Sequence, residues 1–70
     1  MNKNKLRAVM VLNDDTVRSL SAAMGMARQT FYSKMNGTSD FKQSEIGFIQ
    51  KRYDLTAENV NEIFFDSKVS

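Results

Sequence analysis

Arg28 and Gln29 are adjacent side chains whose polar groups suit planar hydrogen-bonding partners. A guanidinium matches O6 and N7 of guanine, and a carboxamide matches N6 and N7 of adenine, each pair giving about 1–3 kcal/mol of discrimination. Tyr32, one helical turn later, has a ring that can stack on a sugar or touch a thymine methyl, and Ser33 beside it is short and permissive. This chemistry is useful only if one helix presents these side chains to solvent together.

The composition offers few residues for catalysis, disulfide formation or metal binding. The 70 residues include no cysteine and no histidine, so disulfides and thiolate metal sites are excluded and the usual general base at neutral pH is missing. A structural zinc site made of carboxylates alone would be unusual. The chain is also too short to enclose a substrate pocket as well as a core. We therefore expect no enzyme, no metal, no cofactor and no small-molecule ligand.

The N-terminal segment does not predict export or a membrane anchor. Its basic start is followed by a short apolar run, residues 8–12, which ends at Asn13-Asp14-Asp15. A signal peptide needs a longer apolar region and a small-residue cleavage site, and a membrane span needs roughly twenty apolar residues. We expect a cytoplasmic protein with no membrane partner.

Charge is distributed unevenly along the chain. Residues 1–52 contain nine Lys/Arg and four Asp/Glu, a net charge of +5, whereas residues 53–70 contain one lysine and four acids, a net charge of −3. Such asymmetry indicates a basic face for a polyanion and a C-terminal part with another task.

The positions of helix caps and turn residues predict an all-α fold, a compact five-helix domain that occupies residues 1–70. Proline is absent, Thr16 and Thr56 are good N-caps, and Gly25 stands where a left-handed residue closes a helix. The predicted helices are residues 3–13, 17–24, 28–35, 42–53 and 57–65. Their predicted core faces are Leu6, Val9 and Met10; Val17, Leu20, Ser21 and Met24; Phe31 and Met35; Ile46, Ile49 and Tyr53; and Val60, Ile63 and Phe64. Phe48 lies off these stripes, and its environment is left open.

The segment from Thr16 to Gly37 carries the strongest functional signal. Two short helices meet here at a tight turn, where Ser21 allows close approach and Gly25 can adopt a positive φ. Leu20, Met24, Met26 and Phe31 supply the apolar wedge between the two helices. This arrangement allows a second helix to project into the DNA major groove.

These residues resemble the helix-turn-helix of the Cro and repressor family of temperate phages, the lambda-repressor-like or Xre-type regulators. The shared features are Met24-Gly25-Met26, the spaced apolar residues and the closing Met35-Asn36-Gly37. Residues 28–31, 36–37 and 44–46 are similar to small regulators of phages and mobile elements of Gram-positive bacteria. The resemblance covers about residues 6–64. It implies a lambda-repressor-like fold, binding to double-stranded DNA and, through it, association with the nucleoid.

The resemblance also implies the roles of individual residues. The exposed start of the recognition helix touches base edges, the start of the preceding helix binds a phosphate, and the segment after the recognition helix makes further phosphate contacts. The predicted DNA-binding residues are Arg28, Gln29, Tyr32 and Ser33 for bases, with Thr16, Val17, Ala27, Asn36, Thr38, Ser39 and Lys42 around them.

Two residues depart from the family pattern. Ala27 replaces a small hydroxyl residue at the start of the recognition helix, which removes a cap worth typically ~1 kcal/mol and one potential phosphate contact. Lys34 replaces a residue that is often apolar, so its stem should lie on the core while its ammonium reaches solvent or phosphate. Simpler roles also exist: Arg28 and Gln29 as a solvated helix start, Tyr32 as a packed residue, Ser33 and Lys42 as surface residues, and Thr16 as a cap only.

One recognition helix contacts only a few base pairs, so the family solution is a homodimer on a pseudo-palindromic operator with half-sites roughly 34–36 Å apart. The predicted dimer contact is Ile63-Phe64-Phe65 with Glu62 and Asp66, because two adjacent phenylalanines cannot both face one core stripe. Alternatively, Phe65 covers the N-terminal helix. The implied mechanism is steric repression by a Cro-like or short repressor. The alternative is an antitoxin or anti-repressor module that binds protein on the same fold.

Overall fold

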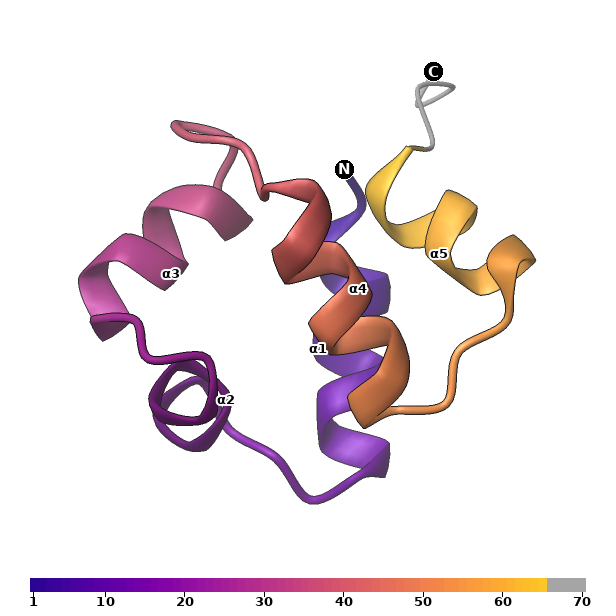
Figure 1. The fold of residues 1–70 in the computed structure, drawn as a ribbon, viewed down its shortest axis with the longest axis horizontal. Helices are drawn as coiled ribbons and strands as arrows, with labels where there is room; N and C mark the ends of the chain where they lie inside the picture. Colours follow the sequence, from indigo (N-terminus) through magenta and orange to yellow (C-terminus); the bar gives the residue numbers. More distant parts are fainter. Residues whose placement is uncertain (66–70) are drawn as a thin grey trace.

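The computed structural model describes residues 1–65, which form five α-helices and no strand (Figure 1). The predicted all-α class is confirmed, and every helix bound lies within one residue of its predicted position. None of the described helices is long and apolar enough to cross a membrane. The helices are α1 (Lys3–Leu12), α2 (Val17–Ala23), α3 (Arg28–Met35), α4 (Gln43–Arg52) and α5 (Ala57–Phe64).

Three of the helices begin with a side chain that accepts a hydrogen bond from the first turn. Thr16 Oγ1 accepts from the Ser19 amide at 3.1 Å, and Ser19 Oγ accepts from the Thr16 amide at 2.9 Å. Thr56 and Asn59 form the same reciprocal pair at the start of α5, and Asn2 caps α1. Since such a cap typically contributes ~1 kcal/mol, the predicted caps at Thr16 and Thr56 fix where α2 and α5 begin.

The turns after four of the helices need left-handed backbone. Gly25 and Gly37 have φ values of +69° and +87°, as a helix-closing glycine requires. A Cβ at either position would have open space around it, so backbone conformation rather than crowding favours glycine there. Asp14 and Asp54 adopt φ values of +56° and +53°, which aspartate tolerates better than most side chains.

Every helix contributes to one apolar core. The half-buried Phe41 ring packs against this core and contacts Phe31 and Phe64 edge to face, with ring centroids 5.7 and 5.5 Å apart. Aromatic pairs with this geometry add about 0.5–1.5 kcal/mol beyond the area they bury. The buried apolar residues are Leu6, Met10, Leu20, Phe31, Met35, Ile46, Ile49, Tyr53, Val60, Ile63 and Phe64.

The helices divide into two groups around this core. Helix α2 packs on α3, and α5 packs on both α1 and α4. In Figure 1, α2 and α3 occupy the left side, α5 occupies the right side, and α1 and α4 lie between them. The outer surface of α3 is therefore far from the outer surface of α5.

Candidate nucleic-acid interface

The turn between α2 and α3 is tied together by its own backbone. The Met26 amide donates to the Ser21 carbonyl at 2.9 Å, and the Gly25 amide donates to the Ala22 carbonyl at 3.0 Å. Ser21 is fully buried, while Met24 and Met26 are half-buried against the core. The predicted close approach at Ser21 and the predicted positive φ at Gly25 are both confirmed. Together they fix the angle at which α3 leaves α2.

Helix α3 has one buried and one exposed face. Phe31 is fully buried, whereas Arg28 and Gln29 are exposed and Tyr32 retains 47% of its accessible surface. In residues 1–65, the side chains of Arg28 and Gln29 form no hydrogen bond or ion pair. A guanidinium and a carboxamide therefore stand side by side at the start of α3, with their hydrogen-bonding groups available to a ligand.

Two residues near these side chains are less available. Ala27 is the N-cap of α3 and provides no side-chain hydrogen bond, as alanine must. Ser33 is half-buried, and its hydroxyl donates to the Gln29 carbonyl at 3.2 Å. The Ser33 carbonyl accepts from the amides of Thr38 and Ser39, at 2.9 and 3.2 Å. Ser33 thus closes the end of α3, and its hydroxyl already has a partner inside the chain.

The loop from α3 to α4 presents several predicted phosphate contacts together. Asn36, Thr38, Ser39 and Lys42 are all exposed. The Asn36 carboxamide oxygen accepts a hydrogen bond from the Lys3 ammonium at 3.4 Å, which brings a lysine of α1 to the same edge. Within the described chain the Lys42 ammonium forms no ion pair, so its charge is available to an anion.

Lys34 lies beneath this loop and corrects one expectation. Only 8% of the residue is exposed, and its ammonium donates to Glu45 Oε1 at 3.0 Å and to the Asp40 carbonyl at 3.2 Å. The stem does lie on the core, as predicted. The prediction that the ammonium reaches solvent or phosphate is wrong, because the ammonium is buried and bonded to the Glu45 carboxylate and a loop carbonyl.

Glu45 links this ion pair to the start of α4. Its Oε1 atom also accepts from the Lys42 amide at 2.8 Å, which satisfies a free amide at the first turn of the helix. Burial raises the pKa of Glu45, but the hydrogen bonds from the Lys42 amide and the Lys34 ammonium outweigh it, and the net pKa is lowered. The ionised carboxylate therefore holds the α3–α4 loop at both of its ends.

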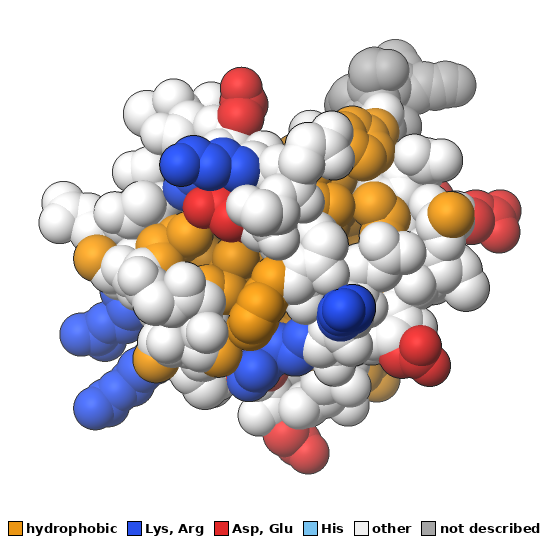
Figure 2. Space-filling model, viewed as in Figure 1, with side chains coloured by type: hydrophobic (Ala, Val, Ile, Leu, Met, Phe, Trp, Pro, Cys, Tyr) orange, Lys and Arg blue, Asp and Glu red, His pale blue; other side chains and the backbone are white. Residues whose placement is uncertain are grey.

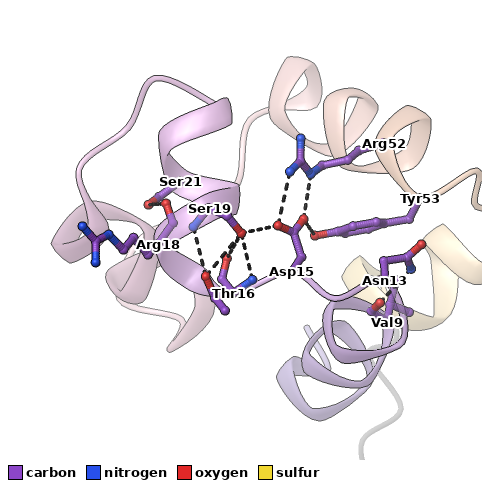
Figure 3. Close-up of polar contacts among 9 residues, drawn as sticks. All are labelled: Val9, Asn13, Asp15, Thr16, Arg18, Ser19, Ser21, Arg52 and Tyr53. Atoms are coloured by element: carbon purple, nitrogen blue, oxygen red, sulfur yellow. Dashed lines mark hydrogen bonds and ion pairs between the residues drawn. The ribbon is translucent and has the colours of Figure 1, made fainter.

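A second polar network was not predicted from the sequence, which had assigned Asp15 only to turn material. The Asp15 side chain is 6% exposed and lies between α2 and α4 (Figure 3). Arg52 donates to it from Nε at 2.7 Å and from Nη2 at 3.2 Å, and the Tyr53 hydroxyl donates at 2.5 Å. The Ser19 hydroxyl donates to it as well. One carboxylate therefore joins the first turn of α2 to the last turn of α4.

The ionisation of this network follows from its geometry. The hydrogen bonds from Arg52, reinforced by those from Ser19 and Tyr53, hold the pKa of Asp15 well below its usual range despite burial. Burial, together with the Asp15 carboxylate, raises the pKa of Tyr53 well above its usual range. Asp15 is thus a carboxylate, and Tyr53 a neutral hydroxyl, throughout the neutral range.

The predicted phosphate contact at Thr16 and Val17 lies beside this network. The Thr16 hydroxyl is occupied by the cap that it forms with Ser19, and Val17 is half-buried. Asp15 also places a negative charge at the first turn of α2, compensated by Arg52. An anion near a helix N-terminus is stabilised by the free amides there. A phosphate at this position would therefore meet an end of α2 that already has an anion.

The surface charge follows the division of the helices only in part. In Figure 2, lysine and arginine side chains extend from the left edge, where α2 and α3 lie, and acidic side chains lie on the right, where α5 lies. Acidic side chains also lie at the upper left and at the bottom of this view, and basic ones lie near its centre. The basic side chains of the first group include Arg18 on α2 and Arg28 on α3. The predicted separation of basic and acidic parts along the chain is therefore only partial in space, since α1, with three basic residues, packs on α5.

The apolar surface agrees with expectation at the end of α5 and differs from it at the end of α1. Phe64 is buried and Phe65 is half-exposed, so the two phenylalanines do face different environments. Asp66, which the sequence assigned to the same contact, lies outside the described residues. The sequence did not predict that Val11 and Leu12, at the end of α1, would be the most exposed large apolar side chains, at 71% and 82%.

Neither a metal site within residues 1–65 nor a match to a known protein adds to these observations. Residues 1–65 contain no group of three or more acidic, histidine or cysteine side chains that could hold a metal ion. A hollow of about 440 Å³ lies between the N-terminus, the α3–α4 loop and the end of α5, and it is lined in part by Phe41 and Phe65. Comparison with protein-family models, curated proteins and solved structures found no match to this chain.

Proposed function

We propose that this chain is a sequence-specific regulator of transcription that binds double-stranded DNA through a helix-turn-helix, α2 and α3. The observation that carries the proposal is the pair Arg28 and Gln29, exposed and unpartnered at the start of a helix whose other face is buried. Side chains of these two types form the bidentate contacts that distinguish guanine and adenine in the major groove. A helix with this division of faces can enter the groove while its scaffold stays intact.

In this proposal the base contacts are concentrated on three residues. Arg28 and Gln29 bind base edges, and Tyr32 contacts a sugar or a thymine methyl one turn later. Ser33 contributes less than the resemblance implies, because its hydroxyl is bonded to the Gln29 carbonyl. Base contacts specify a sequence, whereas phosphate contacts set position and orientation.

Phosphate contacts come mainly from the loop after α3. Lys42 supplies a free ammonium, and Thr38 and Ser39 supply exposed hydroxyls in the same loop. Asn36 and Lys3 lie at the same edge. The N-terminus of α2 has a smaller role, since the Thr16 hydroxyl and the Asp15 carboxylate already occupy it. The docked protein would therefore hold DNA more firmly on the loop side of α3 than on the α2 side.

The regulatory mechanism in this proposal is steric. As in the lambda-repressor-like regulators that the sequence resembles, a homodimer binds a pseudo-palindromic operator that overlaps a promoter and blocks polymerase. Two copies are needed because one recognition helix contacts too few base pairs to define a site. The proposed role is that of a Cro-like or short repressor, whose control comes from concentration and competition for operators.

The proposal is tested by selecting bound duplexes from a random pool and then measuring the affinity of the winning sequence across a salt series. We expect enrichment of a palindrome with at least one G and one A contact in each half-site. The logarithm of the affinity should fall linearly with the logarithm of salt concentration, by about 0.9 for each phosphate contact. A pool that shows no enriched sequence contradicts the proposal.

A further inference from the structure

The three cations of α1 lie on two different flanks of the helix. Because an α-helix turns by about 100° per residue, Lys3 and Arg7 lie on one flank, and Lys5, two positions from each, lies on the other. Lys5 pairs with Glu62 of α5 at 3.6 Å. Lys3 and Arg7 are exposed, and in residues 1–65 neither takes part in an ion pair. The flank formed by Lys3 and Arg7, called the basic flank of α1, therefore has two charges that these residues leave uncompensated.

The basic flank of α1 borders the end of the recognition helix. Lys3 Nζ donates to Asn36 Oδ1 at 3.4 Å, a contact between residues 33 positions apart in the chain. Asn36 is the C-cap of α3 and is exposed. In Figure 1 the N-terminal end of α1 lies near the α3–α4 loop, as this contact requires. Arg7 is one turn further along α1, about 6 Å along the helix axis. The flank thus continues the edge of the loop along α1.

The contact with Lys3 also sets the direction of the Asn36 carboxamide. An ammonium has donors only, so the carboxamide must turn its oxygen toward Lys3. The amide nitrogen of Asn36 then points away from Lys3, and within the described residues it forms no hydrogen bond. The oxygens of a phosphate diester are acceptors. This NH₂ group and the remaining N–H groups of Lys3 are donors at one place, and they suit such a ligand.

The α3–α4 loop by itself provides no net charge for a polyanion. Within residues 36–42 the positive charge of Lys42 is cancelled by that of Asp40. The ammonium beneath the loop, that of Lys34, is already paired with a carboxylate. The two cations of the basic flank bring the net charge of this edge to +2. Because DNA is attracted by cations that replace the counterions of its phosphates, this edge depends on α1 for its electrostatic attraction.

We propose that the basic flank of α1 binds phosphates of the DNA backbone, which makes α1 a third DNA-contacting element beside the α2–α3 unit and the α3–α4 loop. Lys3 and Asn36 together bind one phosphate, and Arg7 binds a neighbouring one, for which a guanidinium offers two parallel hydrogen bonds. These contacts add affinity and fix orientation without specifying bases. The inference rests on the proposed function and deepens it, since it extends the same DNA-binding surface.

The experiment measures binding of the full chain to two labelled duplexes by fluorescence anisotropy across a salt series. One duplex is the selected palindrome, and the other is a fixed mixed-sequence duplex of equal length. For Lys3→Ala/Arg7→Ala, the slope of log affinity against log salt should fall by about 1.8 on both duplexes, and affinity at about 0.1 M salt should fall at least ~tenfold. The preferred palindrome should stay the same.

The matched control is Lys5→Ala/Lys51→Ala, which removes the same number of charges from exposed positions away from this edge. Its slope should equal that of the wild type. Thermal melts should show both double variants folded, because all four side chains are exposed.

Neutral methylphosphonates, placed at one phosphate at a time, locate the contact. The wild type should lose affinity at the phosphates that the basic flank binds, and Lys3→Ala/Arg7→Ala should be insensitive at those positions. The inference is overturned if the two double variants have equal slopes, if methylphosphonates affect both proteins alike, or if the wild type binds neither duplex.

The outcomes for this inference and for the proposed function are separable. A selection that enriches no sequence, together with the expected fall in slope on the mixed-sequence duplex, refutes the proposed function and supports the contact by α1. An enriched palindrome with an unchanged slope in Lys3→Ala/Arg7→Ala gives the converse.

Discussion

Arg28 and Arg52 show how differently two arginines of one small chain are used. Arg52 donates two hydrogen bonds to Asp15 and holds α4 to the start of α2. Arg28 is exposed, and within residues 1–65 it has no partner. A guanidinium that is satisfied inside the chain contributes to stability, whereas one that is left unsatisfied remains available to a ligand. Replacing Arg52 by alanine should therefore lower stability without changing DNA specificity, whereas replacing Arg28 by alanine should do the reverse.

The largest effect is expected from Asp15→Ala, which removes the hydrogen-bond acceptor at the centre of the network that joins α2 to α4. The change strips Arg52, Tyr53 and Ser19 of a common partner, and it should lower the free energy of unfolding by about 3 kcal/mol. Urea denaturation followed by circular dichroism measures this. Asp14→Asn is the matched control, since it also removes an acidic charge but at an exposed position whose left-handed backbone asparagine tolerates. Equal losses in both variants would contradict the role given to Asp15.

A smaller effect, on binding rather than folding, is expected from Arg28→Ala. Specific DNA binding should weaken by about 1–3 kcal/mol, with relaxed preference at one base position. Unfolding should change by less than about 0.5 kcal/mol, because the side chain is exposed and unpaired. Arg52→Ala should show the reverse pattern, a less stable protein with unchanged base preference. The contrast between the two arginines fails if Arg28→Ala leaves the preference of the selected duplex intact.

Acid should lower the stability of the protein by protonating Asp15, the carboxylate shared by Arg52, Tyr53 and Ser19. The pKa of Asp15 is lowered in the folded chain, so its contribution is complete above the unfolded value of about 3.9 and is lost as the pH falls below it. We expect a loss on the order of 1 kcal/mol by about pH 3. Urea melts at several pH values measure the slope. Asp15→Asn should flatten it, and an unchanged slope in that variant would assign the acid sensitivity to other carboxylates.

The smallest effect is expected from Lys42→Ala in the α3–α4 loop. Removing a phosphate contact should weaken binding to all sequences alike and reduce the salt slope by about one unit. Lys51→Ala, at an exposed lysine in the last turn of α4, should leave the slope unchanged. A change in base preference would show instead that Lys42 contacts a base edge.

The parts of this fold that could be predicted from the sequence are those fixed by local physics. The caps at Thr16 and Thr56 and the left-handed residue at Gly25 are recognisable because their hydrogen bonds and backbone angles involve near neighbours. The apolar periodicity then places Phe31 inside and leaves Arg28 and Gln29 outside. For the same reason the exposed part of the candidate site could be predicted from α3 alone.

The features that were missed depend on contacts between distant residues. Asp15 lies 37 positions from Arg52 in the chain, and nothing near either residue indicates that they meet. Lys34 was expected to reach solvent, because its partner Glu45 belongs to the next helix. Val11 and Leu12 lie outside the core stripe predicted for the first helix, but the extent of their exposure was not predicted. Which face remains uncovered depends on where α5 docks.

The buried ammonium of Lys34 has a consequence for the thermodynamics of the proposed complex. By binding the Asp40 carbonyl and the Glu45 carboxylate, it orders the α3–α4 loop within the free protein. The conformational entropy of this loop is therefore lost on folding and not on docking, and ordering one residue costs roughly 1–2 kcal/mol. Lys42 thus meets its phosphate on a backbone that is already in place, and calorimetry should find little entropic penalty from this edge of the interface.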